Sequence, residues 1–236
     1  MLLDGKELAV ERGIIFDVTE HEGAELLLHD ERAAVARLGG LYKCAFAEPT
    51  DLIGYAARLG ISGELCLTNM PKNAPELLGF EADACKSFAW LGGLPPTCAC
   101  GGADIRKLAP TLAETLLGHY SCRGGSYTVE EMRKIMRAHA VLGALDDGKL
   151  AGFIGRHSDG SMGMLTVLDG FRRRGIGEAL ECAMITLVML EGRVPLCDVY
   201  EDNAPSVASQ QKLGMTAARG YTFWTHTDRV RALCGK

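Results

Sequence analysis

Three arginines that precede a glycine-containing helix start are the residues of this sequence with the clearest capacity for chemistry. Arg172, Arg173 and Arg174 come directly before Gly175-Ile176-Gly177, and a short apolar strand is expected at residues 165–167. The first turn of a helix has unpaired N–H groups and a positive dipole end, so it can hold a phosphate. Glycines let the phosphate reach the backbone, and arginines add positive charge. The pattern therefore predicts a site for a pyrophosphate-bearing cofactor.

Two common phosphate-binding patterns do not fit this segment. A Walker loop needs a Gly, four residues and then Gly-Lys-Ser or Gly-Lys-Thr, and the chain contains no such sequence. A Rossmann fingerprint needs a third Gly or Ala where Leu180 stands. Without its neighbours, a Gly-x-Gly that opens a helix is in most proteins only a place of tight packing.

The order of the surrounding residues is more specific. Arg172-x-x-Gly175-x-Gly177, following a strand at residues 165–167, resembles motif A of the GCN5-related N-acetyltransferases (GNATs), which reads Q/R-x-x-G-x-G/A. Further along, Val199, Asn203 and the Leu-Gly-Met sequence of residues 213–215 resemble the family's motif B, in which a strand ends at Asn and a short helix ends at Gly-Phe. The segment Ile105-Arg106 resembles the family's first strand. The similarity covers about residues 104–225 in the family's order.

The resemblance implies an acyl-CoA cofactor, either acetyl-CoA or another short acyl-CoA. Main-chain N–H groups of the helix start would hold its pyrophosphate, and the strand backbone would pair with the pantetheine arm like an added strand. An N–H group near Leu165 would polarise the thioester carbonyl. The cofactor-binding residues implied in this way are Leu165, Thr166, Val167, Arg172, Arg173, Arg174, Gly175, Ile176, Gly177, Glu178 and Asn203.

The catalytic pair is where the sequence departs from the family. An amine must be neutral to attack a thioester, so a base or a chain of water molecules must take its proton. GNATs often have a Glu on the strand before motif A and a Tyr four residues before the Gly of motif B. Here Ser161 and Gln210 occupy these positions, and neither is a competent acid or base at neutral pH.

Other residues could take over the proton transfer. Glu201 and Tyr200, at the end of an expected strand, are the main candidates, and Glu201 would deprotonate the acceptor directly or through water. Further polar candidates are His157, Tyr120 and Tyr221. Each also has an ordinary structural interpretation, as a strand-end, turn or core-rim residue, and positioning of the reactants alone can supply much of the rate.

The elements that must position these residues follow from turn signals and periodicity. Asp146-Asp147-Gly148 predicts a hairpin between two apolar runs, and a second turn leads into a strand at residues 162–168. Apolar residues at helical spacing predict a long helix from Ile176 that ends at Gly192. Thr128 and Glu131 predict a capping box. Further elements are expected at residues 105–108, 111–120, 128–139, 194–200, 205–213 and 217–225. The fold implied is a mixed α/β sheet, the GNAT acyl-CoA N-acyltransferase fold.

A Gly- and Pro-rich stretch at residues 92–102 predicts a linker between two lobes. We expect a complete GNAT domain at residues 103–236 and a partial, degenerate GNAT-like lobe at residues 1–91. The first lobe repeats the ending of the second, because Asn69 precedes a Leu-Gly pair as Asn203 does. We interpret this as an internal duplication, with chance similarity as the alternative. In the first lobe we expect strands at residues 24–29, 33–38 and 85–90 and a helix at residues 51–59. The two-lobe layout is similar to the glycine N-acyltransferase group.

Composition excludes several classes of protein. The chain has 236 residues, of which 47% are hydrophobic, so it can bury a sizeable core. Its formal net charge of -5 makes it a poor general binder of nucleic acid. No stretch reaches the roughly 18 apolar residues of a membrane span, and no secretory signal is visible, so we expect a cytoplasmic protein. Cys98 and Cys100 have no further zinc ligands at suitable spacing nearby, so no metal site is predicted.

Two functions from different classes remain open. The first is an N-acetyltransferase that moves an acetyl group directly from acetyl-CoA to a primary amine of a small molecule or peptide. The second is a catalytically silent acyl-CoA sensor or interaction protein with a GNAT fold, which Ser161 and Gln210 favour. A third, an acetyltransferase toxin acting on charged tRNA, fits poorly with the acidic charge. The sequence does not decide the acceptor, the acyl chain length or whether the chain forms a homodimer.

Overall fold

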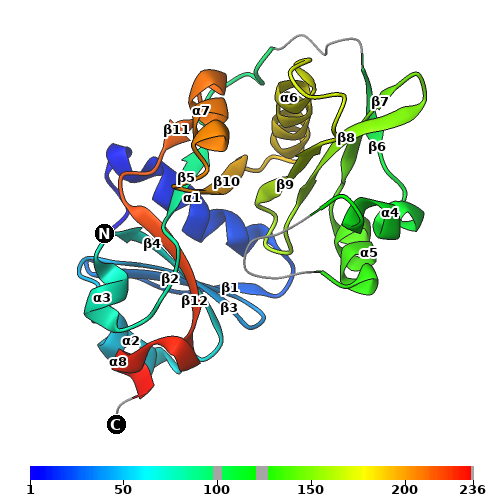
Figure 1. Cartoon of the computed structure of the whole chain (residues 1–236). Helices are drawn as coiled ribbons and strands as arrows, with labels where there is room; N and C mark the ends of the chain where they lie inside the picture. Colours follow the sequence, from blue (N-terminus) through cyan, green and yellow to red (C-terminus); the bar gives the residue numbers. More distant parts are fainter. Residues whose placement is uncertain (98–102, 121–126, 235–236) are drawn as a thin grey trace. The chain divides into compact units, whose positions relative to one another are not determined.

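The computed structural model of the chain describes residues 1–97, 103–120 and 127–234. These residues form two compact units, one of residues 1–90 and 198–236 and the other of residues 91–197 (Figure 1). Both units contain helices and strands, which confirms the mixed α/β class predicted from the sequence. Within the described residues, no helix is both long enough and apolar enough to cross a membrane.

A four-stranded antiparallel sheet organises the unit of residues 91–197. Its strands lie in chain order: β6 (Asp104–Lys107), β7 (Leu142–Asp146), β8 (Lys149–Arg156) and β9 (Met162–Val167). The predicted hairpin joins β7 and β8, and Asp147 and Gly148 have the positive φ angles, 47° and 77°, that a two-residue I′ turn requires. Strand β9 is the last strand of this sheet, so one of its edges is unpaired within the sheet.

Helices cover both faces of this sheet, because successive side chains of a strand point to opposite faces. Phe153 packs in a cluster with α4 (Ala113–Leu117) and α5 (Val129–Ala138). A Cβ on the neighbouring Gly152 would instead contact Leu180 of α6 (Ile176–Leu190). The predicted capping box of α5 is present, with hydrogen bonds in both directions between Thr128 and Glu131. The helix predicted at residues 111–120 is shorter: a 3-10 turn (Pro110–Leu112) leads into α4, which ends before Gly118.

The other unit contains an eight-stranded sheet with the order β1-β2-β3-β4-β12-β5-β10, and β11 pairs with β5. Strands β3 and β4 are parallel, and β12 is antiparallel to both of its neighbours. The strands are β1 (Ala24–His29), β2 (Ala33–Leu38), β3 (Leu41–Phe46), β4 (Glu64–Met70), β5 (Cys85–Ala89), β10 (Leu196–Tyr200), β11 (Thr216–Ala217) and β12 (Tyr221–His226).

The helices of this unit are short. They are α1 (Ala9–Asp17), α2 (Asp51–Leu59), α3 (Ala74–Leu78), α7 (Ala204–Leu213) and α8 (Arg231–Cys234), with 3-10 turns at Lys6–Leu8, Val18–Glu20 and Thr227–Arg229. The strands predicted at residues 24–29 and 33–38 and the helix predicted at residues 51–59 have those bounds. Helix α1 and strands β3 and β4 were not predicted.

The last strand of the chain, β12, lies between β4 and β5, two strands of the first ninety residues. Residues 198–236 therefore group with residues 1–90, whereas the sequence predicted a domain of residues 103–236. Two contacts fix the entry into β12. The buried carboxylate of Glu11 accepts the N–H groups of Arg219 and Gly220 at 2.6 and 3.2 Å. A Cβ on Gly220 would lie 2.7 Å from backbone carbons of Asn69, so only glycine fits this approach.

The two short helices whose endings look alike in sequence also end alike in structure. Helix α3 ends at Gly79 and α7 at Gly214, and both glycines have left-handed φ angles, 69° and 85°. Each helix follows an N-cap asparagine, Asn73 for α3 and Asn203 for α7, so the cap of α3 is not the Asn69 that the sequence comparison had paired with Asn203. The internal duplication remains an interpretation.

Candidate functional site

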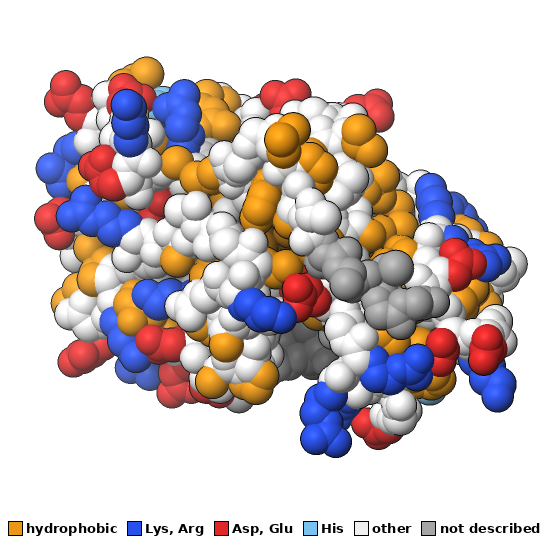
Figure 2. Space-filling view, turned by 90° about the horizontal axis from the view of Figure 1, so that it is seen from above, with side chains coloured by type: hydrophobic (Ala, Val, Ile, Leu, Met, Phe, Trp, Pro, Cys, Tyr) orange, Lys and Arg blue, Asp and Glu red, His pale blue; other side chains and the backbone are white. Residues whose placement is uncertain are grey.

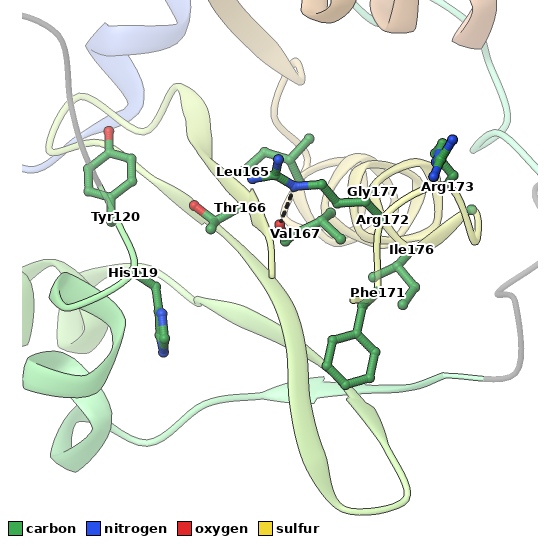
Figure 3. A pocket seen from close by; sticks show the side chains of 11 residues that line it. His119, Tyr120, Leu165, Thr166, Val167, Phe171, Arg172, Arg173, Ile176 and Gly177 are labelled. Carbon is green, nitrogen blue, oxygen red and sulfur yellow. Dashed lines mark hydrogen bonds between the residues drawn. The ribbon is translucent and has the colours of Figure 1, made fainter. Parts of the chain in front are cut away.

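A pocket of about 490 Å³ lies along β9 and the start of α6, within the unit of residues 91–197 (Figure 3). Its lining combines the end of a strand, a glycine-containing turn, a helix start and the segment that follows α4. The lining residues are His119, Tyr120, Leu165, Thr166, Val167, Phe171, Arg172, Arg173, Gly175, Ile176 and Gly177. Eight of the eleven residues that the resemblance assigns to the cofactor lie together here.

The turn from β9 into α6 has the backbone of an anion site. Arg173 and Gly175 both have left-handed φ angles, 61° and 78°, and Gly175 is the N-cap of α6. Such turns point successive N–H groups towards one place and form a concave anion-binding nest. The N–H of Ala179 donates to the carbonyl of Gly175, so the N–H groups of Ile176 and Gly177 precede this helical hydrogen bond. Both residues line the pocket, where these groups can hold a phosphate.

Gly177 keeps this helix start open. A Cβ on Gly177 would lie 3.5 Å from Cγ2 of Val167 and 3.9 Å from Cδ2 of Leu165, which are ordinary contact distances. The packing of the chain would therefore accept an alanine, as the Gly-or-Ala of the motif A pattern implies. A longer side chain would extend into the pocket.

The three arginines have different surroundings. Arg172 lines the pocket with an exposed side chain, and its Nε donates to the carbonyl of Val167 at 3.2 Å (Figure 3). Arg173 lines the pocket as well. Arg174 instead pairs with Asp146 of the β7–β8 hairpin at 3.0 Å and lies over the ring of Phe171. Arg174 thus holds the turn against the hairpin, and neither it nor Glu178 is a lining residue.

Strand β9 contains a bulge directly before its residues that line the pocket. The register between β8 and β9 shifts between Phe153 and Gly155, and Met164 has a φ of 58°, which is unusual for a residue with a side chain. A bulge leaves one residue outside the hydrogen-bond ladder and re-aims the groups beside it. Leu165, the next residue, is the first residue of β9 that lines the pocket. The bulge therefore lies where the resemblance places the oxyanion donor.

Two aromatic or heteroaromatic side chains form the opposite wall. His119 and Tyr120 follow α4, and Figure 3 shows them across β9 from the α6 start, with the Thr166 hydroxyl group between. Tyr120 was among the polar candidates of the sequence, but His119 and Phe171 were not predicted. No periodic pattern distinguishes them, because they lie in irregular segments beside a short helix and a turn.

Glu201, Tyr200 and Asn203 belong to the other unit. The carboxylate of Glu201 accepts hydrogen bonds from Lys72 at 2.6 Å and from the Tyr221 hydroxyl at 2.9 Å. These two donors, Lys72 above all, hold the pKa of Glu201 below its usual value. A carboxylate with a lowered pKa is a weaker base. Asn203 uses its side-chain oxygen to cap α7, accepting the N–H of Ser206 at 3.3 Å.

Ser161 and Gln210, the two positions that depart from the GNAT pattern, are both held within the fold. The Ser161 hydroxyl donates to the buried carboxylate of Asp159 at 2.7 Å, within the turn between β8 and β9. Gln210 is buried in α7. No group of three or more His, Cys, Asp or Glu side chains suited to a metal ion occurs among residues 1–97, 103–120 and 127–234. Cys98 and Cys100 lie outside the described residues.

Residues 141–225 match the FR47-like protein family. The matched range runs from β7 to most of β12. No curated protein matches the sequence.

Solved structures resemble the chain over most of its length. A putative acetyltransferase of the GNAT family from Novosphingobium aromaticivorans has 18% identity and a TM-score of 0.54, over 90% of this chain and 95% of that one. A GCN5-related N-acetyltransferase from Kribbella flavida has 12% identity and a TM-score of 0.57, over 94% and 95%. A GCN5-related N-acetyltransferase-like protein from Streptococcus suis has 17% identity and a TM-score of 0.51, over 90% and 92%.

Proposed function

Because the chain has the GNAT fold, and its residues 141–225 match the FR47-like family, we propose that it is an acyl-CoA-dependent N-acyltransferase. It transfers an acetyl or other short acyl group from CoA to a primary amine of a small molecule or peptide. The observation that carries the proposal is the pocket at the α6 start, where Arg172, Ile176 and Gly177 line one cavity.

The lining of this pocket, from a strand edge to a helix start, suits an extended cofactor. In this proposal the α6 start and Arg172 hold the pyrophosphate, and the unpaired edge of β9 from Val167 back to Leu165 holds the pantetheine arm. On binding, the Arg172 side chain would leave the Val167 carbonyl, which it now covers at 3.2 Å, and turn to the phosphates. Such an exposed arginine moves at little cost, since its ion pair with Asp169 is exposed as well.

The β9 bulge would activate the thioester carbonyl of the bound acyl-CoA. An N–H group that the bulge at Met164 re-aims towards the pocket would donate to the thioester oxygen and stabilise the negative charge that develops there. Proton transfer from the amine does not need Glu201, whose carboxylate is engaged by Lys72 and Tyr221.

The acceptor is better described as a small amine than as a nucleic acid. Lys and Arg side chains alternate with Asp and Glu side chains on the face that Figure 2 draws, without one extended basic patch. A formal net charge of -5 also disfavours general binding of nucleic acid, because that affinity depends on neutralising phosphates.

A silent acyl-CoA sensor is the second candidate, and one observation favours it. The positions of the usual catalytic Glu and Tyr hold Ser161 and Gln210, one engaged by Asp159 and the other buried. The sensor and the enzyme both predict CoA binding, so only turnover distinguishes them.

The proposed transfer is tested by measuring the release of free thiol from acetyl-CoA with a panel of primary amines. We expect at least one amine to raise thiol release above the rate of hydrolysis without amine, and mass spectrometry to detect the acetylated amine. A chain that binds CoA but acetylates no amine would be the sensor. A chain that does neither would contradict both candidates.

A further inference from the structure

We infer that His157 is the general base that deprotonates the acceptor amine, and that Tyr127 positions its imidazole. This inference rests on the proposed acyl transfer. His157 follows β8 and was only one of several polar candidates in the sequence, where it looked like an exposed turn residue. In the structure it is half-buried and fixed by contacts on two sides.

The first contact is with the backbone of β9. A Cβ on Gly163 would lie 2.2 Å from Nε2 of His157, so the imidazole occupies the space that any other side chain at this position would fill. Gly163 directly precedes Met164 and the bulge, and Leu165, where the pocket begins, is two residues further on. Two residues of a strand span roughly 7 Å. Nε2 thus lies against the backbone of β9 at Gly163, two residues before Leu165, the first residue of β9 that lines the pocket.

The second contact fixes the ring. Nδ1 of His157 is 2.7 Å from the Tyr127 hydroxyl oxygen, and the two rings are tilted at 32° with centroids 6.3 Å apart. The ring of Tyr127 in turn stacks on Tyr120, which lines the pocket, with centroids 6.3 Å apart. With the Nδ1 proton donated to the Tyr127 oxygen, the lone pair of Nε2 is available as a base.

The turn behind the ring is well anchored. The N–H of His157 donates to the carbonyl of Ser161, and the N–H of Gly160 donates to the carbonyl of His157. Asp159, in the same turn, is buried and accepts from Ser161. Ser161, in the place of the usual glutamate, therefore helps to hold the loop that carries His157.

The chemical step is balanced without any further reactant. The amine nitrogen forms a bond to the thioester carbonyl carbon, and the proton of that nitrogen passes to Nε2 of His157. The C–S bond breaks, and its electron pair leaves with the CoA sulfur as a thiolate. The imidazolium then gives its proton to the thiolate or to solvent, which restores the free base.

The test uses the full chain with acetyl-CoA and the best amine of the panel, and compares His157→Ala with wild type. We expect kcat to fall by about 100- to 10,000-fold, which is the usual contribution of general acid–base catalysis. The dissociation constant of CoA should stay within about threefold, because His157 is not a lining residue of the pocket. Added imidazole should restore part of kcat, an effect that a purely structural role would not give.

Two further variants separate positioning from folding. Tyr127→Phe keeps the ring and removes the oxygen, so kcat should fall by about 10-fold while the melting temperature changes little. Gly163→Ala should displace the imidazole and lower kcat without touching the pocket lining. His226→Gln, at a surface histidine of the other unit, is the matched control and should have wild-type kcat.

The outcomes are distinct. Wild-type kcat in His157→Ala, or a loss of kcat that imidazole does not restore and that Tyr127→Phe does not share, would overturn the role of His157. If His157→Ala does not fold, Tyr127→Phe and Gly163→Ala test the role of His157 instead. Wild-type kcat in both of these variants would then overturn that role. If the wild type acetylates none of the amines, the proposed acyl transfer itself is contradicted. A CoA titration then shows whether the chain still binds the cofactor.

Discussion

Replacing Gly177 by aspartate is expected to weaken CoA binding strongly while the fold persists. Gly177 is in the first turn of α6 and lines the pocket, so the new carboxylate would lie beside the pyrophosphate. Repulsion between these charges at about 4 Å should weaken binding by at least about 100-fold, or about 2.7 kcal/mol. The same carboxylate near a helix N-terminus is favourable to the helix by about 0.3–1 kcal/mol, so the melting temperature should not fall. Calorimetric titration and a thermal melt measure the two effects.

Gly177→Ala is the matched control for this variant. Its methyl group meets Val167 and Leu165 at ordinary contact distances, and alanine is the better helix former. We therefore expect CoA affinity within about 10-fold of wild type and an equal or higher melting temperature. Unchanged CoA affinity in Gly177→Asp would show that the phosphates lie elsewhere.

Replacing Glu191 by alanine is expected to destabilise the unit of residues 91–197 strongly. Arg156, at the end of β8, is only 2% exposed, and its guanidinium makes a two-point ion pair with Glu191 at 2.6 and 2.8 Å. Its Nε has no hydrogen-bond partner within the described residues. Removing the carboxylate leaves a buried charge uncompensated, at a cost of about 3 kcal/mol. The apparent melting temperature should fall by roughly 6–12 °C.

The companion variant is Arg156→Met, which replaces the buried charge with an unbranched apolar side chain. A buried pair can often be replaced in this way at little cost, so we expect Arg156→Met to lower the melting temperature much less than Glu191→Ala. Adding Arg156→Met to Glu191→Ala should recover most of the lost stability, as a double-mutant cycle can measure. Equal losses in both single variants, with no recovery in the double one, would contradict this account.

The residues that line the candidate pocket could be picked out from the sequence because their signals are local. The strand, the turn with the arginines and the glycine N-cap occupy residues 162–177, and each is recognised by residues a few positions apart. The same is true of the β7–β8 hairpin at Asp147-Gly148 and the capping box at Thr128. The local pattern could not show which of the three arginines line the pocket. Arg174 does not, because it pairs with Asp146 on another element.

The remaining features depend on pairing between distant residues. Strand β12 lies beside β4, so Phe223 is opposite Leu67, and no local pattern selects that partner. The domain boundary predicted from the linker therefore did not include the grouping of residues 198–236 with residues 1–90. His157 was one of several polar candidates in the sequence, and no local pattern distinguished it, because the contacts that fix it come from Tyr127, thirty residues earlier, and from a glycine on the next strand.

One titration tests the central claim, that the amides at the start of α6 hold the phosphates of CoA. Wild-type protein is titrated by calorimetry with CoA and, in parallel, with pantetheine, which has the same thiol-bearing arm and no pyrophosphate. We predict saturable binding of one CoA per chain, and affinity for pantetheine that is at least about 10-fold weaker, since the helix start and Arg172 have no phosphate to hold. No heat with millimolar CoA, or equal affinity for the two ligands, would contradict the account.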